Sequence, residues 1–112
     1  MAGVEVQLLR FKSVDGAQAF VDDMRTQAEE QARMGQFDPF ISANAGSFDR
    51  VRGDRSAREA ITVTLLGLSA EDRLGRIWVS RGREVVQIVL VNSPASDREV
   101  AASIDQVFRG TR

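Results

Sequence analysis

The chain has 112 residues, of which 43% are hydrophobic and 28% are charged, and its formal net charge is −1. This length suits one domain, and the charge argues against a general nucleic-acid binder, whose surface is usually clearly basic. The sequence contains no histidine, cysteine or tyrosine, and imidazole and thiolate groups carry most acid–base, nucleophilic and transition-metal chemistry near neutral pH. We therefore expect no catalytic residues, no metal and no cofactor.

Membrane insertion is also not expected. No apolar run approaches the roughly 18 residues of a membrane-spanning helix, and the first residues lack the basic and long apolar segments of a signal peptide. The compartment stays open: cytoplasmic for the chain as given, or extracytoplasmic if it is a domain of a longer exported or anchored protein.

The first predicted elements are a strand and a long helix. Residues 4–11 alternate between the two faces of a strand. Ser13 is typical of a helix N-cap, and Gly35 is expected to end the helix in the left-handed conformation. Between these two residues, apolar side chains recur at the spacing of one helix face: Ala17, Phe20, Val21, Met24 and Ala28.

The next segment, residues 36–47, has no periodicity and contains turn residues. Phe37, Phe40 and Ile41 are nevertheless too apolar for a mobile linker. Two interpretations follow: a lid folded back over the core, or the mouth of a ligand pocket. The lid is favoured, because apolar loops usually cover an exposed core edge.

The second half of the chain predicts strands separated by short connections. The predicted strands are residues 47–52, residues 60–68 and two strands within residues 76–91. The first of them is short and charged, which suits an edge of the sheet. Residues 53–58 form a turn and residues 69–75 a loop. The last two strands make a tight hairpin around residues 80–83, where Gly82 can adopt a positive φ.

A second helix is predicted at the end of the chain. Pro94 ends the last strand, and Ser96 with Glu99 matches a capping box. The helix stripe follows: Val100, Ile104, Val107 and Phe108. The expected fold is α+β in the order β-α-β-β-β-β-α: a single domain over residues 1–112, with a mostly antiparallel five-stranded sheet and both helices on one face.

Arginines are the first candidate for a polar site. If Arg50 and Arg52 share a strand face with Arg76, their guanidinium groups could hold a phosphate or carboxylate. Neutralisation by neighbouring acids such as Asp49 and Asp54 is the favoured interpretation.

Trp78, the one tryptophan, is the second candidate. It alternates with Arg76 and Ser80 along a strand, so it lies on the face opposite Ile77 and Val79. Two interpretations stay open. Trp78 belongs to the core under a helix, or it marks an exposed partner or ligand surface.

The second half also resembles a known family. The segments SFDRVRG, AITVTLLGL and GRIWVSRGREVVQIVLVNSP, followed by a helix ending IDQVFRG, are similar to the Mog1/PsbP-like α+β domains of actinobacterial lipoproteins and exported proteins. The resemblance implies a non-catalytic binding or accessory domain and is compatible with an extracytoplasmic location, and it assigns no functional residues.

Three functional hypotheses result. The first is a non-enzymatic domain that binds a protein partner, or itself as a homodimer, through an exposed sheet face around Trp78. The second is a carrier or sensor of a small apolar ligand, with a pocket between sheet and helices gated by Phe37, Phe40 and Ile41 and with Gln87 or Arg76 as its polar groups. An enzyme that uses carboxylates or arginines comes third.

Overall fold

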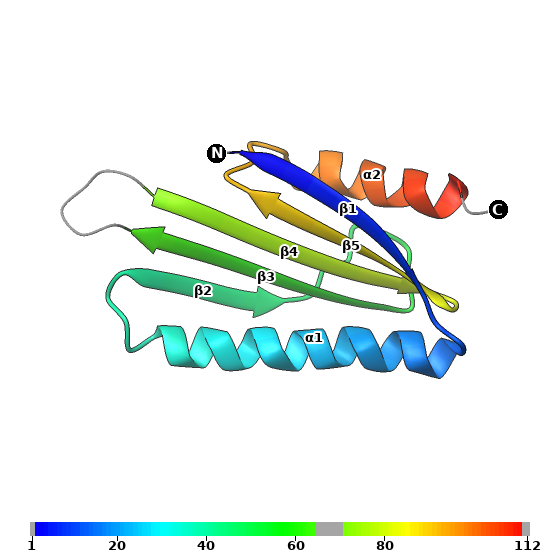
Figure 1. Cartoon of the computed structure of the whole chain (residues 1–112), viewed down its shortest axis with the longest axis horizontal. Helices are drawn as coiled ribbons and strands as arrows, with labels where there is room; N and C mark the ends of the chain where they lie inside the picture. Colours follow the sequence, from blue (N-terminus) through cyan, green and yellow to red (C-terminus); the bar gives the residue numbers. More distant parts are fainter. Residues whose placement is uncertain (1, 65–70, 111–112) are drawn as a thin grey trace.

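The computed structural model describes residues 2–64 and 71–110. Within them, five strands form one antiparallel sheet with two helices, which confirms the predicted class and the predicted order (Figure 1). The elements are β1 (Gly3–Arg10), α1 (Val14–Gly35), β2 (Ile41–Gly46), β3 (Arg55–Thr64), β4 (Glu71–Arg81), β5 (Glu84–Val91) and α2 (Asp97–Gly110). Neither helix is long and apolar enough to cross a membrane.

The strand order in the sheet is β1-β5-β4-β3-β2. Strands β2 to β5 follow one another as an antiparallel meander, and β1 pairs with the last of them. The β4–β5 hairpin closes at the Arg81–Glu84 pair, with Gly82 at the predicted positive φ of 61°. Strands β1 and β2 are therefore the two edges of the sheet.

Local capping explains where the helices begin. The Ser13 hydroxyl accepts a hydrogen bond from the Gly16 N–H at 3.0 Å, as expected for an N-cap. Ser96 and Glu99 satisfy each other's backbone N–H groups at 3.2 and 3.3 Å, which confirms the capping box. Helix α1 ends at Gly35 without the expected left-handed residue, because the chain leaves through a right-handed turn with Gln36 at φ −62°.

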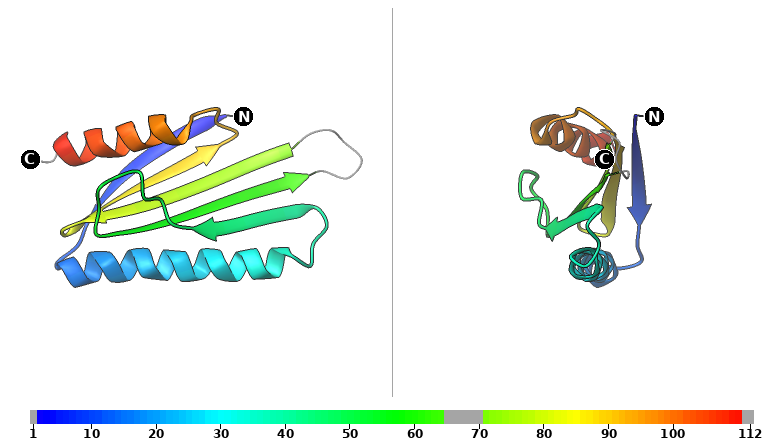
Figure 2. Two further views of the ribbon diagram at one scale, coloured as in Figure 1. Left: turned by 180° about the vertical axis from the view of Figure 1, so that it is seen from behind. Right: turned by 90° about the vertical axis from the view of Figure 1, so that its left-hand side faces the viewer.

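The two helices lie on opposite faces of the sheet, so the prediction of both on one face was wrong. Successive strand residues point to opposite faces. Ile77 and Val79 pack in one cluster with Val100, Ile104 and Phe108 of α2, whereas Trp78 packs in another with Ala17 and Val21 of α1. Figure 2 shows α1 and α2 on different sides of the strands. The reason is that the central strands are apolar on both faces, and each face needs a cover.

The loop between β2 and β3 helps α2 to cover its face. Residues 47–52 were predicted as an edge strand but form this loop, and Phe48 and Val51 are buried against the α2 cluster. Figure 2 shows the loop on the same side of the sheet as α2. The edge strand is instead Ile41–Gly46, because its alternate residues Ile41 and Ala43 face α1.

The β3–β4 hairpin is longer than predicted. Part of the expected turn, residues 53–58, already belongs to β3, which begins at Arg55. Part of the expected loop, residues 69–75, belongs to β4, since pairing continues to Thr64 and Glu71. The predicted strand end at residues 65–68 and the loop residues 69 and 70 lie outside the described residues.

Candidate functional site

Trp78 is a core residue. Its side chain is 1% exposed and packs against α1. The indole Nε1 donates a hydrogen bond of 2.6 Å to Oε1 of Gln87, and the Arg76 guanidinium lies 5.2 Å from the indole ring centroid. The structure thus brings together three of the predicted site residues, but Trp78 itself offers no exposed surface to a partner.

A chain of polar side chains continues from Trp78 to the sheet edge. Gln87 donates to Oε1 of Gln7 at 3.1 Å, and Gln7 donates to Oε1 of Glu5 at 3.0 Å. The register explains this row, because Gln87 lies directly opposite both Trp78 and Gln7 in its two neighbouring strands. Sequence reasoning missed Gln7, which is 80 positions from Gln87, since only strand pairing brings the two side chains together.

Glu59 is a buried carboxylate that sequence reasoning also missed. It is 1% exposed, and its Oε1 accepts hydrogen bonds from Nε and Nη2 of Arg76 at 2.8 and 2.5 Å. Its Oε2 is buried and accepts no hydrogen bond from the described residues. The alternation Ala57, Glu59, Ile61 is the signal that could have placed it on an inward face. The pair holds Arg76 in position, and removing one partner from such a pair is strongly destabilising.

The predicted anion site does not form. Arg50 lies on the loop at the α2 face and pairs with Asp97 at 3.8 Å. The carbonyl of Arg52 accepts hydrogen bonds from the Arg81 guanidinium at 3.1 and 2.6 Å. Arg76 points to the α1 face and binds Glu59, so the condition for an anion site, a strand face shared by the three arginines, is not met. The reason is that residues 47–52 are not a strand.

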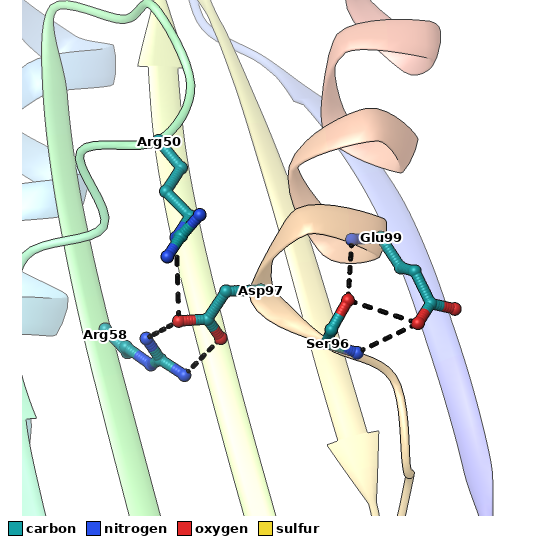
Figure 3. Close-up of polar contacts among 5 residues, drawn as sticks. All are labelled: Arg50, Arg58, Ser96, Asp97 and Glu99. Carbon is teal, nitrogen blue, oxygen red and sulfur yellow. Dashed lines mark hydrogen bonds and ion pairs between the residues drawn. The ribbon is translucent and has the colours of Figure 1, made fainter.

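Asp97 joins the first turn of α2 to the sheet (Figure 3). Its two carboxylate oxygens accept hydrogen bonds from Nη1 and Nη2 of Arg58 at 2.9 and 2.7 Å. These hydrogen bonds lower the pKa of Asp97 below its ordinary value of 3.8; burial opposes the shift, and the charges of Arg58 and Arg50 add to it. This contact fixes the position of α2 and shows no sign of a ligand site.

The apolar residues after α1 do not form the favoured lid. Phe37 is 83% exposed and Phe40 is also exposed. Residues 36–40 form a tight turn in which Asp38 accepts the Phe40 N–H at 2.9 Å, and this turn is too short to fold back over the core. Ile41 does line a hollow.

The hollow has a volume of about 300 Å³ and lies between the end of α1 and strands β2 and β3. Its apolar lining comes from Met34, Ile41, Ala43 and Ile61. Gln31, Gly35 and Asp38 complete the wall. Of the residues predicted for a ligand pocket, only Ile41 lines this hollow. Phe37, Phe40, Gln87 and Arg76 do not line it, so the hollow is a different one from the pocket that was predicted.

Strand β1 is an open edge of the sheet. Val4 and Val6 are 55% and 40% exposed, and no strand among the described residues pairs with their outer side. The Phe11 N–H, one residue after β1, donates a hydrogen bond of 2.8 Å to the carbonyl of Arg83, one residue before β5. Because hydrogen-bonding direction alternates along a strand, odd-numbered residues of β1 bond β5, and Val4, Val6 and Leu8 direct their N–H and C=O groups outward.

Comparison of the chain with protein-family models, with curated proteins and with solved structures finds no match. The resemblance to Mog1/PsbP-like domains therefore stays a prediction. Within the described residues, no three acidic side chains gather in a group that could hold a metal ion. The open edge of β1 and the hollow beside α1 are the two surfaces from which a function can be argued.

Proposed function

We propose that this chain is a non-enzymatic interaction domain that binds an extended polypeptide strand along β1. The observation that carries the proposal is the open edge itself: eight residues, Gly3–Arg10, with two exposed valines and a row of outward backbone groups. Added strands at such an edge gain affinity from main-chain hydrogen bonds and specificity from alternate side chains.

The composition of β1 supports this use of the edge. Proteins usually protect an exposed edge strand with proline, lysine, a bulge or a covering element. Strand β1 contains neither proline nor lysine, and its charged residues are Glu5 and Arg10. Its register with β5 runs without interruption from Gly3 to Arg10. A partner strand can therefore reach the apolar side chains of β1 and pair with its regular row of backbone groups.

A backbone substitution tests the proposal. Val6→Pro removes an outward N–H without breaking the ladder to β5, since proline is tolerated where the strand N–H faces solvent. Val14→Pro is the matched control, because Val14 is the first residue of α1, where proline fits. A photo-cross-linking residue in place of Val4 reports what lies against the edge, both in the purified protein and in an extract of the cells that make it.

We expect polypeptide cross-links from position 4 that Val6→Pro abolishes and Val14→Pro leaves intact. Cross-links to a second copy or to another protein both support the proposal. Absence of any polypeptide cross-link, or equal yields in the two proline variants, would overturn it. Circular dichroism of both variants verifies that each remains folded.

A second candidate function is binding of a small apolar ligand in the hollow beside α1. The observation in its favour is the apolar lining around about 300 Å³, the lower end of the volume range for ligand pockets. Ala43→Phe fills the hollow, and Ala60→Phe is the control, because Ala60 is exposed on the opposite face of β3. Loss of binding of the probe anilinonaphthalene sulfonate in Ala43→Phe alone would support this function, and equal binding in both variants would contradict it.

A further inference from the structure

We infer that the strand received by β1 is β1 of a second copy, so that two chains form one continuous antiparallel sheet around a two-fold axis. This inference rests on the proposed function and names the partner at the same edge. It follows from the self-complementarity of β1 in one register, argued below from its side chains and backbone groups.

Symmetry restricts the possible registers. A two-fold axis perpendicular to the sheet leaves the α2 face of both copies on the same side. Side chains alternate between faces along a strand, and opposed residues point to the same face, so even-numbered residues oppose even-numbered ones and odd-numbered residues oppose odd-numbered ones. The axis therefore passes through a residue of β1, and the middle of the strand offers Glu5, Val6 or Gln7. These three registers differ in the side chains that they place opposite each other.

The register centred on Val6 is the most favourable. It places Val6 against Val6 and Val4 against Leu8 on one face, and Glu5 against Gln7 on the other, where an amide can donate to the carboxylate. Centring on Glu5 sets two carboxylates directly opposite each other, which is destabilising. Centring on Gln7 sets Val4 against Arg10 instead of against an apolar residue.

Backbone groups are compatible with this register, as they are with the other two, because pairing of equal parity always joins outward-pointing residues to each other. Val4, Val6 and Leu8 are the residues whose N–H and C=O groups point outward, as inferred from the Phe11–Arg83 hydrogen bond. Each of them meets another outward-pointing residue when the axis passes through Val6. All three positions therefore form hydrogen-bonded pairs in which both N–H···O bonds are exchanged.

Apolar burial also favours this assembly. Val4 and Val6 lie beside Leu90 and Ile88 of β5, and Leu8 and Leu90 already pack against the α2 cluster. Pairing would continue the apolar surface of one copy into that of the other. It would cover part of the exposed surface of both valines in each copy.

The other edge explains why assembly would stop at a dimer. Strand β2 has six residues, its exposed side chains Ser42 and Asn44 are polar, and α1 packs along it. It therefore lacks the apolar row that β1 presents. Because β1 pairs with its own symmetry mate, the interface closes after two copies and leaves no second edge of the same kind.

Sedimentation equilibrium over a range from about 1 µM to about 1 mM protein tests the inference. We expect the wild type to dimerise and Val6→Lys to weaken dimerisation by at least about a hundredfold, because two ammonium groups would face each other where two valines were buried. Val14→Lys is the matched control, since Val14 is 43% exposed but lies away from the edge. It should dimerise like the wild type.

Cysteine cross-linking fixes the register, because the natural chain has no cysteine. Opposed residues in a hydrogen-bonded pair have Cα atoms about 5.5 Å apart, within reach of a disulfide. We expect Val6→Cys to form a disulfide-linked dimer under mild oxidation faster than Gln7→Cys or Val14→Cys. Faster linkage of Gln7→Cys would overturn the proposed register.

The outcomes separate this inference from the proposed function. A purified protein that stays monomeric, while its position-4 cross-links to another protein in extract still depend on Val6, would overturn self-pairing and leave the proposed function standing. A dimer that forms equally well in Val6→Lys and Val14→Lys would overturn pairing through β1. Circular dichroism and thermal unfolding of Val6→Lys verify that a loss of dimer is not a loss of fold.

Discussion

The two faces of the sheet are stabilised in different ways. On the α1 face, small side chains such as Ala17 and Ala28 bring the helix close to strands that carry Trp78 and the buried Glu59–Arg76 pair. The α2 face is an apolar cluster covered jointly by α2 and the loop that follows β2. The ionic contact between Arg58 and Asp97 lies at the partly exposed rim of this face. The comparison teaches that one strand, β4, contributes to two apolar cores: Ile77 and Val79 on the α2 face, and Trp78 on the α1 face, where Arg76 adds an ion pair with the buried Glu59.

The largest expected effect is a cavity on the α2 face. Phe48→Ala removes a buried ring from the covering loop and is expected to lower the free energy of unfolding by about 3–5 kcal/mol. Phe37→Ala is the matched control, with an expected change within about 0.5 kcal/mol, because its ring is already in water. Urea unfolding of both variants measures the difference, and similar losses would contradict the assigned burial.

On the α1 face, the fold should lose stability when the buried Glu59 carboxylate loses its partner. Arg76→Ala leaves the Glu59 carboxylate buried without its partner and should lower the free energy of unfolding by about 2–4 kcal/mol, less than the largest values because Arg76 is partly exposed. Replacement of both residues by leucine should be less destabilising than Arg76→Ala. A double variant as unstable as the single one would show that packing, not the unpaired carboxylate, causes the loss.

A smaller effect is expected where the covering loop meets the α2 face. A Cβ at Gly53 would lie 2.6 Å from Cγ1 of Val79 and 2.8 Å from the Ser80 carbonyl. Gly53→Ala must therefore displace the loop and should lower the free energy of unfolding by about 1–3 kcal/mol. Gly46→Ala has open space around the added methyl group and is the control. Equal thermal midpoints for the two variants would contradict this tight contact.

The smallest effect concerns the rim of the α2 face. Because the folded state lowers the pKa of Asp97, the Arg58–Asp97 contact stabilises the fold above pH 3.8, and this contribution is lost as the pH falls through the lowered value. Both side chains are more than one-third exposed, so we expect less than about 1 kcal/mol. Arg58→Ala should raise the Asp97 pKa toward 3.8 in an NMR titration of its carboxyl carbon. An unchanged pKa would contradict the role of Arg58.

Local sequence patterns predicted much of the fold. The helix stripes, Ser13, the Ser96–Glu99 box and Gly82 act over a few residues, so their spacing was enough to place both helices and the β4–β5 hairpin. One misplaced strand was predicted between β2 and β3, where charged residues such as Arg50 resembled an edge strand. The buried positions of Phe48 and Val51 depend on contact with α2, which is distant in sequence.

The candidate site was less predictable than the fold. The sequence indicated a chain without histidine, cysteine or tyrosine. Strand alternation placed Trp78 with Arg76, whereas Gln87 was named only as a polar group of a predicted pocket. It left open whether Trp78 is buried, because alternation separates the faces of a strand without telling which helix covers each face. The burial of Glu59 and the row from Trp78 to Gln7 also depended on strand pairing.

By itself, therefore, the sequence determined the order of the elements and the positions of all but β2, since these follow from periodicity, capping and turn chemistry within short windows. Only the tertiary structure decided that the helices cover opposite faces, that Trp78 lies in the core and that β1 is an open edge with Val4 and Val6 exposed. These features come from pairing between distant segments such as β1 and β5. Periodicity gives each strand two faces, but contacts across the fold decide which of them meet water.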